Sequence, residues 1–423
     1  MSDLAASGLH GSATTARGEF ARGWRPLLAS AVGIGLGMSP LPTFTWGAFA
    51  IALVHQYGWA RGQILGASIL QTASLFLIGP LLGRLTDKIG ARPVAMASTL
   101  ALGVTLCCFS LITANIWTYY AVYFAMAFLS VGTMPTIYAK VISLWYDRKR
   151  GMALGLALCT TGISGMLLPI YAQALIGSIG WRGAFVGVGL LPLVIALPCI
   201  LFFLPKGIGP TLGDTPDSVV EPAVIDGASI GEALRTYRYW LMAILALIAG
   251  GGLSGIVYNL VPLLVDRGFT PASAAKLFGL YGLFVVGGRL LSGWLLDKFW
   301  APAVGCVFLL MPCAGALLLV GGGASVRLLA LAVVMLALAS GSEFDLVAYL
   351  TGRYFGRRNF SALYSGQYAF FGIGAGCAPS IFGVVHDVYG SYNSALFVTS
   401  ALFGASALAI LTLGRYPRFA SGH

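Results

Sequence analysis

Charge is the scarcest property of this sequence. Only 9% of its 423 residues are Asp, Glu, Lys or Arg, against about a quarter in soluble domains. Hydrophobic residues make up 58% of the chain, and the mean hydropathy is +0.87. This apolar surface exceeds what one soluble core can bury, so lipid must be the solvent for much of the chain.

Several signatures of chemistry are missing as well. The sequence has no glycine-rich phosphate-binding loop, no His–Glu metal pattern and no nucleophile elbow. We therefore expect neither an ATP-driven pump nor an enzyme, and no cofactor. All seven cysteines lie inside apolar segments without metal-ligand spacing, which predicts no metal site and no disulfide framework. The net charge of +11 is spread over short loops between apolar runs, which argues against nucleic-acid binding.

Long apolar runs are what the sequence does have. Twelve are long enough to cross about 30 Å of hydrocarbon, and they predict an all-α integral membrane protein of two pseudo-symmetric six-helix bundles. The expected spans are residues 26–53, 63–83, 93–112, 117–143, 152–176, 182–204, 237–264, 273–296, 302–322, 327–352, 360–384 and 392–414. The corresponding domains are a cytoplasmic tail (1–25), an N-terminal bundle (26–204), a cytoplasmic linker (205–236), a C-terminal bundle (237–414) and a cytoplasmic C-terminal tail (415–423).

The positions of the basic residues predict the orientation. With the N-terminus inside, only five of the 25 Lys and Arg residues lie in outer loops and two lie within spans. The positive-inside rule then places both termini in the cytoplasm of a protein that crosses the inner (plasma) membrane many times. The first apolar run is too long for a signal-peptide core, so we expect the N-terminus to remain uncleaved.

The two halves of the chain repeat each other. The loop Gly83-Arg-Leu-Thr-Asp-Lys88 returns as Gly293-Trp-Leu-Leu-Asp-Lys298, an offset of 210 residues. Because six spans separate the copies, both halves have the same orientation, and such parallel repeats form a site between the halves near the bilayer midplane. The same offset relates Gly58 to Gly268, Pro169 to Pro379 and Gly180 to Gly390.

The loop Gly83-Arg-Leu-Thr-Asp-Lys-Ile-Gly-Ala-Arg92 resembles the signature loop of the major facilitator superfamily, and its second copy lies where that superfamily repeats it. Asp87 ends a helix beside a basic cluster, where cations and helix N-termini can hold a carboxylate. Such a clamp would stabilise one of two access states; a solvated turn is the alternative. The resemblance implies a gating motif of Gly83, Arg84, Asp87, Lys88, Gly90, Arg92, Gly293, Asp297 and Lys298.

A narrower resemblance is to the monocarboxylate transporters and their bacterial relatives, the oxalate/formate antiporters. Four stretches carry it: residues 145–157, 180–182, 287–293, and 341–345 with 354–356. The resemblance implies a secondary active transporter of mono- or dicarboxylates that works by alternating access as a monomer, either proton-coupled or anion-exchanging. The alternative is an exporter of drugs or other metabolites in which Arg289 is structural.

Charges inside the spans are the strongest site candidates, because a charge at mid-membrane costs about 2.5–3.5 kcal/mol. Arg289 lies about 12 Å of helix rise from Asp297, too deep to reach the inner surface easily. The resemblance implies that Arg289 binds the substrate carboxylate; an ion pair with Glu343 or Asp345 is the alternative. The family aspartate one turn earlier is Val285 here, so the familiar proton scheme cannot be copied.

Glu343 is the candidate proton carrier, since burial disfavours a charged carboxylate and Ser340 shares its helix face. Asp345 lies about 200° further around the helix, so only one of the two acids can face the cavity. We assign Glu343 to the cavity and Asp345 to packing, with the reverse left open. Lys140 has three interpretations: it binds the anion, pairs with Glu343, or extends to the cytoplasmic surface.

Polar and aromatic residues in two spans are weaker candidates for lining a small-anion cavity, and packing between helices is the alternative for each. These candidates are Tyr258, Asn259, Tyr364, Gln367 and Tyr368. The first span contains Gly35, Gly37, Pro40 and Pro42, which predict a broken helix that lines a gate. His386 lies near an outer end and is given no special role.

Overall fold

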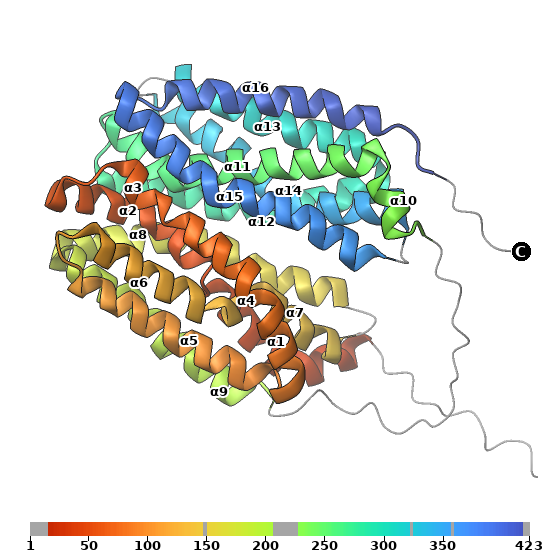
Figure 1. The fold of residues 1–423 in the computed structure, drawn as a ribbon, viewed down its shortest axis with the longest axis horizontal. Coiled ribbons are helices and arrows are strands. Elements are labelled where there is room, and N and C mark those ends of the chain that lie inside the picture. The colour runs from red at the N-terminus through yellow and green to blue at the C-terminus, as the bar shows by residue number, and fades with distance from the viewer. Residues whose placement is uncertain (1–15, 147–149, 206–226, 322–324, 357–358, 418–423) are drawn as a thin grey trace, which may run out of the picture.

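The computed structural model describes residues 16–146, 150–205, 227–321, 325–356 and 359–417, almost all of them in helices. Two bundles, α1–α9 and α11–α16, lie side by side (Figure 1). The helices are α1 (Ala16–Gly35), α2 (Pro40–Tyr57), α3 (Arg61–Gly66), α4 (Ser68–Ile89), α5 (Ala91–Cys108), α6 (Ile116–Leu129), α7 (Pro135–Trp145), α8 (Arg150–Leu191), α9 (Leu197–Phe203), α10 (Ile230–Leu234), α11 (Tyr237–Asp266), α12 (Pro271–Lys298), α13 (Ala301–Gly321), α14 (Val326–Phe355), α15 (Phe360–Tyr389) and α16 (Asn393–Ala409). Short 3-10 turns lie at η1 (Phe109–Leu111), η2 (Val131–Thr133) and η4 (Ile410–Leu413), and a π-turn at η3 (Pro192–Ala196).

The predicted all-α membrane fold is confirmed. In the described chain, ten helical segments are long and apolar enough to cross a membrane. One of them, Met152–Phe203, contains two passes, because α8 is interrupted at Gly180. A further pass is divided between α6 and α7. These segments account for the twelve predicted spans.

The ends of the bundles differ in detail from the predicted boundaries. Helix α1 begins at Ala16, inside the segment predicted as a tail. The short helix α10 lies within the predicted linker, of which residues 206–226 are outside the described chain. Residues 1–15 and 418–423 of the two predicted tails are also outside it.

Two broken passes meet at their breaks. The first pass is interrupted between α1 and α2, as the Gly and Pro residues predict, and α2 restarts with Pro40 in its first turn. At this break the backbone N–H of Met38 donates to Thr133 Oγ1 of η2 at 2.9 Å. A Cβ added to Gly37 would lie 2.7 Å from the Thr133 carbonyl oxygen. At the two breaks, the residues of one pass therefore bond to or pack against the backbone of the other. Such contacts are needed because lipid offers no hydrogen-bond partners to the free backbone groups.

The internal repeat extends to backbone conformation. Gly58 and Gly268, one of the pairs related by the offset of 210, both have positive φ, at 69° and 90°. Gly180 and Gly390 do so as well, at 73° and 67°. Left-handed backbone favours glycine, so equivalent turns of the two halves require the same residue. The repeat found in the sequence of these loops is thus also present in their backbone conformation.

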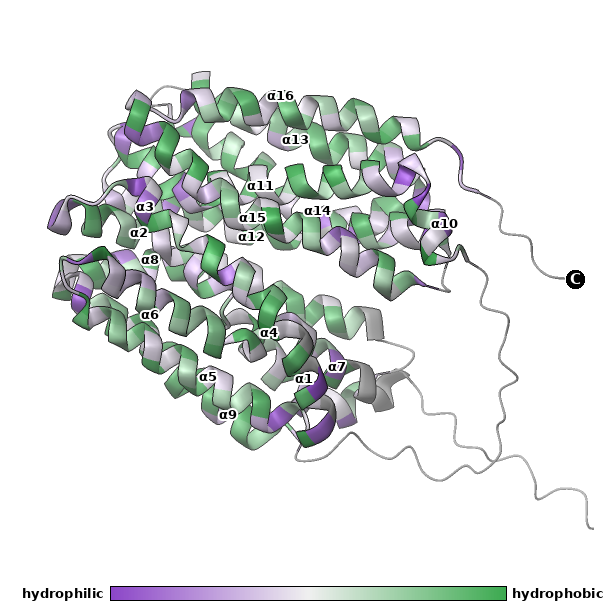
Figure 2. Cartoon of the chain, in the orientation of Figure 1, coloured by the Kyte–Doolittle hydropathy of each residue, from purple (hydrophilic) through white to green (hydrophobic). Residues whose placement is uncertain are grey.

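The outer surface of the bundles is apolar. Figure 2 shows hydrophobic residues along the helices and hydrophilic ones gathered mainly toward their ends. Large apolar side chains such as Leu77, Phe202 and Leu290 are at least 65% exposed. Such a surface suits contact with lipid chains and is expensive in water.

The bundles contact each other through α2, α3, α4 and α8 on one side and α11, α12 and α15 on the other. The closest crossing lies between α8 and α12, where a Cβ on Gly282 would be 2.0 Å from the backbone nitrogen of Met166. The bundles converge at the end where α3 begins, which we call the Arg61 face, and diverge toward the end that carries α10 and the α4–α5 turn, the motif face (Figure 1).

Candidate functional site

A cavity of about 230 Å³ lies between the bundles and is lined by both halves of the chain. Its N-terminal wall is neutral and its C-terminal wall carries the charges. From the first half come Ser39, Pro40, Thr43, Phe44, Ser68, Gln71, Thr72, Leu75, Met134, Pro135, Leu158 and Thr161. From the second come Leu253, Ser254, Val257, Tyr258, Tyr281, Val285, Arg289, Ser340, Glu343, Tyr368, Phe371, Gly372 and Ala375.

Arg289 is the cation of this cavity wall. Its Nε lies 3.6 Å from Asp345 Oδ2, and its side chain is 11% exposed against 37% for Asp345. A separation of 3.6 Å is too long for a hydrogen bond, and Arg289 Nε has no hydrogen-bond partner among the described residues. The guanidinium carries five N–H donors, so one distant carboxylate leaves donors for a ligand.

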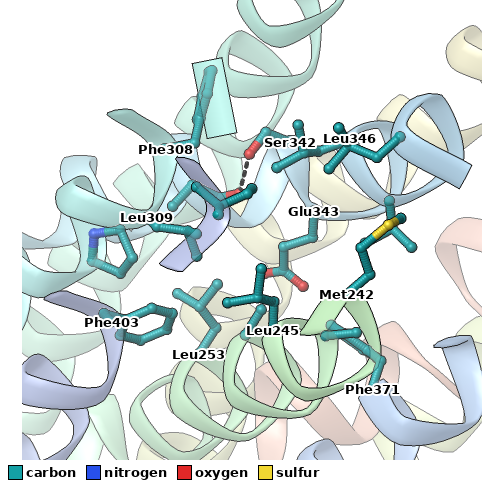
Figure 3. A pocket seen from close by; sticks show the side chains of 17 residues that line it. Met242, Leu245, Leu253, Phe308, Leu309, Ser342, Glu343, Leu346, Phe371 and Phe403 are labelled. Carbon is teal, nitrogen blue, oxygen red and sulfur yellow. Dashed lines mark hydrogen bonds between the residues drawn. The ribbon is translucent and has the colours of Figure 1, made fainter. Parts of the chain in front are cut away.

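Glu343 lies at the boundary between this cavity and a second, smaller one. Its carboxylate extends from α14 toward Leu245 of α11, with Met242 and Phe371 close by (Figure 3). Glu343 Oε1 is buried and has no hydrogen-bond partner in the part of the chain that the structure describes. Glu343 is thus part of the lining of both cavities, while its role as a proton carrier stays a prediction. Asp345 is absent from the lining of the cavity, and its carboxylate faces Arg289.

Two of the aromatic candidates reach the cavity. Tyr258 of α11 accepts a hydrogen bond from Thr43 Oγ1 of α2 at 3.0 Å, which joins the two bundles across the cavity. Tyr368 of α15 lines the same wall as Glu343. Tyr281, which the sequence did not single out, completes the aromatic part of the C-terminal wall and packs against Phe44 of the other bundle.

Four other predicted site residues do not line the cavity. Asn259 is fully buried, and its Nδ2 donates to the carbonyl oxygens of Gly255 and Pro379 at 2.9 and 3.2 Å. Gln367 accepts a hydrogen bond from Thr351 Oγ1 at 2.6 Å. Both amides therefore serve helix packing here. Tyr364 stacks on Phe360, and Lys140 of α7 also lies outside the lining.

The gating motif is described only in part. The surroundings of Gly83 and of the Asp87 side chain lie outside what the structure describes, so the predicted clamp on Asp87 remains a prediction. Gly90, with φ at 90°, forms the turn between α4 and α5. Arg92 Nη2 donates to the carbonyl oxygen of Leu201 in α9. Arg84 and Lys88 are exposed.

In the second copy of the motif, Gly293 and Asp297 are exposed. Lys298 is exposed as well, and its ammonium group lies 4.2 Å from the centroid of the Trp294 ring. This copy therefore presents its charges at the surface of the motif face.

Sequence reasoning missed a polar cluster at the opposite end, which we call the Arg61 clasp: Arg61, Asp266, His386, Asp387 and Tyr392. The Arg61 guanidinium of α3 donates to both Asp266 oxygens at 2.6 and 2.8 Å and to Tyr392 OH at 3.0 Å. His386 Nε2 lies 3.1 Å from Asp266. Since Arg61 belongs to the first half and its partners to the second, the clasp holds the bundles together.

Asp387 contributes to the clasp by capping a helix of the other bundle. Helix α3 has Ala60 at its N-cap position, which offers no side-chain acceptor. The backbone N–H groups of Arg61 and Gly62 instead donate to Asp387 Oδ1 and Oδ2 at 3.1 and 2.8 Å. The positive end of a helix favours a carboxylate, so this contact stabilises closure of the Arg61 face.

The chain belongs to the Major Facilitator Superfamily, whose family model matches residues 27–350. It is 30% identical over 244 residues to monocarboxylate transporter 11 of Homo sapiens, covering 56% of this chain and 48% of that protein. It is 25% identical over 408 residues to monocarboxylate transporter 13 of Rattus norvegicus, covering 93% and 89%. The match to the first of these spans about half of that relative's length.

A solved structure of the nucleoside transporter NupG, determined for a point mutant, has the same fold. It superposes with a TM-score of 0.72 at 11% identity, covering 93% of this chain and 99% of that one. The predicted superfamily is thus confirmed, and the protein is a membrane transporter rather than an enzyme.

Proposed function

We propose that this transporter carries small organic anions, mono- or dicarboxylates, by alternating access through the central cavity. The observation that carries the proposal is Arg289, whose Nε has no hydrogen-bond partner among the described residues and which lies in the wall of a cavity whose opposite described wall is uncharged. A carboxylate is the ligand that matches a guanidinium in charge and in paired geometry. The similarity to proteins named monocarboxylate transporters supports the same solute class.

The size of the cavity supports a small solute. Sites for drug-sized ligands usually measure about 300–1,000 Å³, and this cavity measures about 230 Å³. Its neutral wall offers hydroxyl and amide groups such as Thr43, Thr161 and Gln71. These groups can bond the remaining oxygens of a hydroxy, oxo or second carboxylate group.

The direction of opening follows from the clasp together with the predicted orientation. Closure of the Arg61 face leaves the motif face as the entrance in this conformation. The excess of Lys and Arg in the loops of that face supports a cytoplasmic position for it, and with it an inward-facing state. We propose the cell membrane as the location, with both termini in the cytoplasm and a monomer as the working unit.

The Arg289–Asp345 contact supports a second candidate function. If this pair serves only to hold α12 and α14 together, the protein is a facilitator-type exporter of drugs or other metabolites, and its solute is not recognised through Arg289. The two candidates differ in what loss of the guanidinium does to anion transport.

Counterflow of labelled lactate, pyruvate and oxalate into proteoliposomes separates them. The proposal expects uptake by the wild-type protein, loss in Arg289→Ala and little recovery in Arg289→Lys, because Lys lacks the paired donors. Asp345→Asn is the matched control, which removes the partner and leaves the guanidinium. Counterflow that survives Arg289→Ala unchanged overturns the anion assignment.

A thermal-shift panel of carboxylates provides an independent measurement, since a ligand that binds only the folded protein raises its melting temperature.

The Glu343→Gln variant distinguishes proton-coupled transport from anion exchange. Proton movement driven by the solute should disappear in this variant if Glu343 carries the proton, while anion exchange should continue.

A further inference from the structure

A second cavity of about 50 Å³ lies inside the C-terminal bundle, beside the central one. Its walls come from α11, α13, α14, α15, α16 and η4, with Leu245, Leu309, Leu346 and Phe403 among them. Figure 3 shows these side chains around the carboxylate of Glu343. The two cavities share Leu253, Glu343 and Phe371 in their linings, so they adjoin at these three residues.

The chemistry of this side pocket is almost entirely apolar. Apart from Glu343, its one polar side chain is Ser342, whose hydroxyl already donates to the Ala339 carbonyl oxygen at 2.7 Å. A water molecule needs two to four polar partners to be stable in a cavity, and apart from Glu343 and the already bonded Ser342 the described lining offers none. The pocket therefore suits an apolar group and excludes a polar one.

Rotation of Glu343 connects the pocket to the anion site. Its Oε1 lacks a hydrogen-bond partner among the described residues, and an unpartnered carboxylate oxygen is poorly placed against apolar walls. The central cavity, which Glu343 also lines, holds Arg289 on the same C-terminal wall. A turn of the carboxylate toward Arg289 would remove it from the boundary that the two cavities share at Leu253, Glu343 and Phe371.

We infer that the side pocket is the specificity subsite for the hydrocarbon end of the solute, and that the preferred solutes are monocarboxylates with a short alkyl tail. The inference rests on the proposed function, which places the carboxylate at Arg289. An apolar cavity of about 150 Å³ holds a benzene molecule, so a pocket of about 50 Å³ holds two or three carbons. A second carboxylate has no partner there, and dicarboxylates bind only in the central cavity.

The test measures half-saturation concentrations for straight-chain acids from acetate to heptanoate in proteoliposomes. Burial of each methylene should lower the half-saturation concentration about fourfold, until two or three carbons fill the pocket and the gain stops. Leu309→Ala enlarges the pocket and should move this limit to longer acids. Ala249 also lines the pocket, so Ala249→Leu fills it and should move the limit to shorter acids, with acetate transport preserved.

Leu310→Ala is the matched control, because Leu310 is the neighbour of Leu309 on α13 and is 47% exposed on the bundle surface. This variant loses the same side-chain atoms as Leu309→Ala, but at a position outside the pocket lining. The chain length at which the gain in half-saturation concentration stops should therefore be unchanged. If the acids are transported through Arg289 but the limit is the same in all variants, the subsite is wrong and the proposed function stands. If no acid is transported in an Arg289-dependent way, the proposed function itself is wrong.

Discussion

Asp387→Ala should loosen the Arg61 clasp and shift the protein toward a conformation that is open on the Arg61 face. The substitution removes two hydrogen bonds, of 3.1 and 2.8 Å, from the backbone at the start of α3. Loss of a side-chain N-cap costs about 0.5–2 kcal/mol. Because the cap spans the two bundles, this loss falls on the closed state alone, since opening exposes the same N–H groups to water.

A cost of about 0.5–2 kcal/mol changes an equilibrium constant about 2- to 30-fold. Spin labels at Gln56 and Tyr389, which lie near the ends of α2 and α15 on the Arg61 face and are both exposed, report the separation of the bundles in a cysteine-free background. We expect the ratio of long to short distances to rise by this factor in Asp387→Ala.

Asp387→Asn distinguishes the cap from the charge. Asn is nearly as good an N-cap as Asp, yet it offers one acceptor oxygen and no charge to the cluster around His386 and Arg61. An intermediate shift is therefore expected. An unchanged distance distribution in the folded Asp387→Ala protein would refute the argument that this cap stabilises closure.

Three further predictions concern the bundle interface and the site. Gly282→Val should oppose closure of the Arg61 face more strongly than any clasp variant, because its Cβ would lie 2.0 Å from the Met166 backbone nitrogen. The spin-label distances between Gln56 and Tyr389 report the closed population of this variant. A closed population equal to that of the wild type would contradict the prediction. Arg61→Asp and Asp266→Arg should each slow transport, and the double variant should recover part of the rate because the pair is re-formed in reverse; a double variant no faster than either single one would count against the ion pair. Glu343→Gln should keep or raise the melting temperature in detergent, since it removes an acid whose Oε1 has no partner in the described structure; a large drop would mean that this carboxylate is a structural group.

The fold was predictable because lipid leaves few alternatives. Apolar runs of sufficient length have to be helices, and the offset of 210 residues located both copies of the repeat. Gly58 and Gly268 could be paired by sequence alone, and their shared positive φ is the structural basis of that pairing. The point where α1 begins was missed, because a helix that extends beyond the hydrocarbon no longer needs apolar residues.

The two charges that line the cavity were predictable, whereas the neutral candidates could be separated only in the structure: Tyr258 and Tyr368 line the cavity, and Asn259 and Gln367 do not. Arg289 and Glu343 stand out because charges within spans are rare and costly. Asn259 and Gln367 were equally visible, yet a single helix does not reveal whether a polar side chain meets a cavity or a neighbouring carbonyl group. In the structure Asn259 bonds to Pro379 of α15, which lies 120 residues away.

The Arg61 clasp was invisible for a different reason. Arg61 and Asp266 are 205 residues apart and lie at the ends of passes, where charges are ordinary. His386 was set aside on the same grounds. The pairing depends on how the two bundles meet in one conformation, and sequence patterns within each bundle do not determine that.

The unequal walls of the central cavity have a consequence for the energetics of movement. Both of its charged residues, Arg289 and Glu343, belong to the C-terminal bundle, and the N-terminal wall is neutral. Under the proposed function, an anion held by Arg289 would move with the C-terminal bundle while the N-terminal bundle changes its position against it. Its ionic contact need not break during the swing, and only neutral hydrogen bonds, such as that between Thr43 and Tyr258, are exchanged. Firm recognition of the anion and rapid turnover are therefore compatible in this molecule, since tight binding that is equal in both states does not oppose the transition between them.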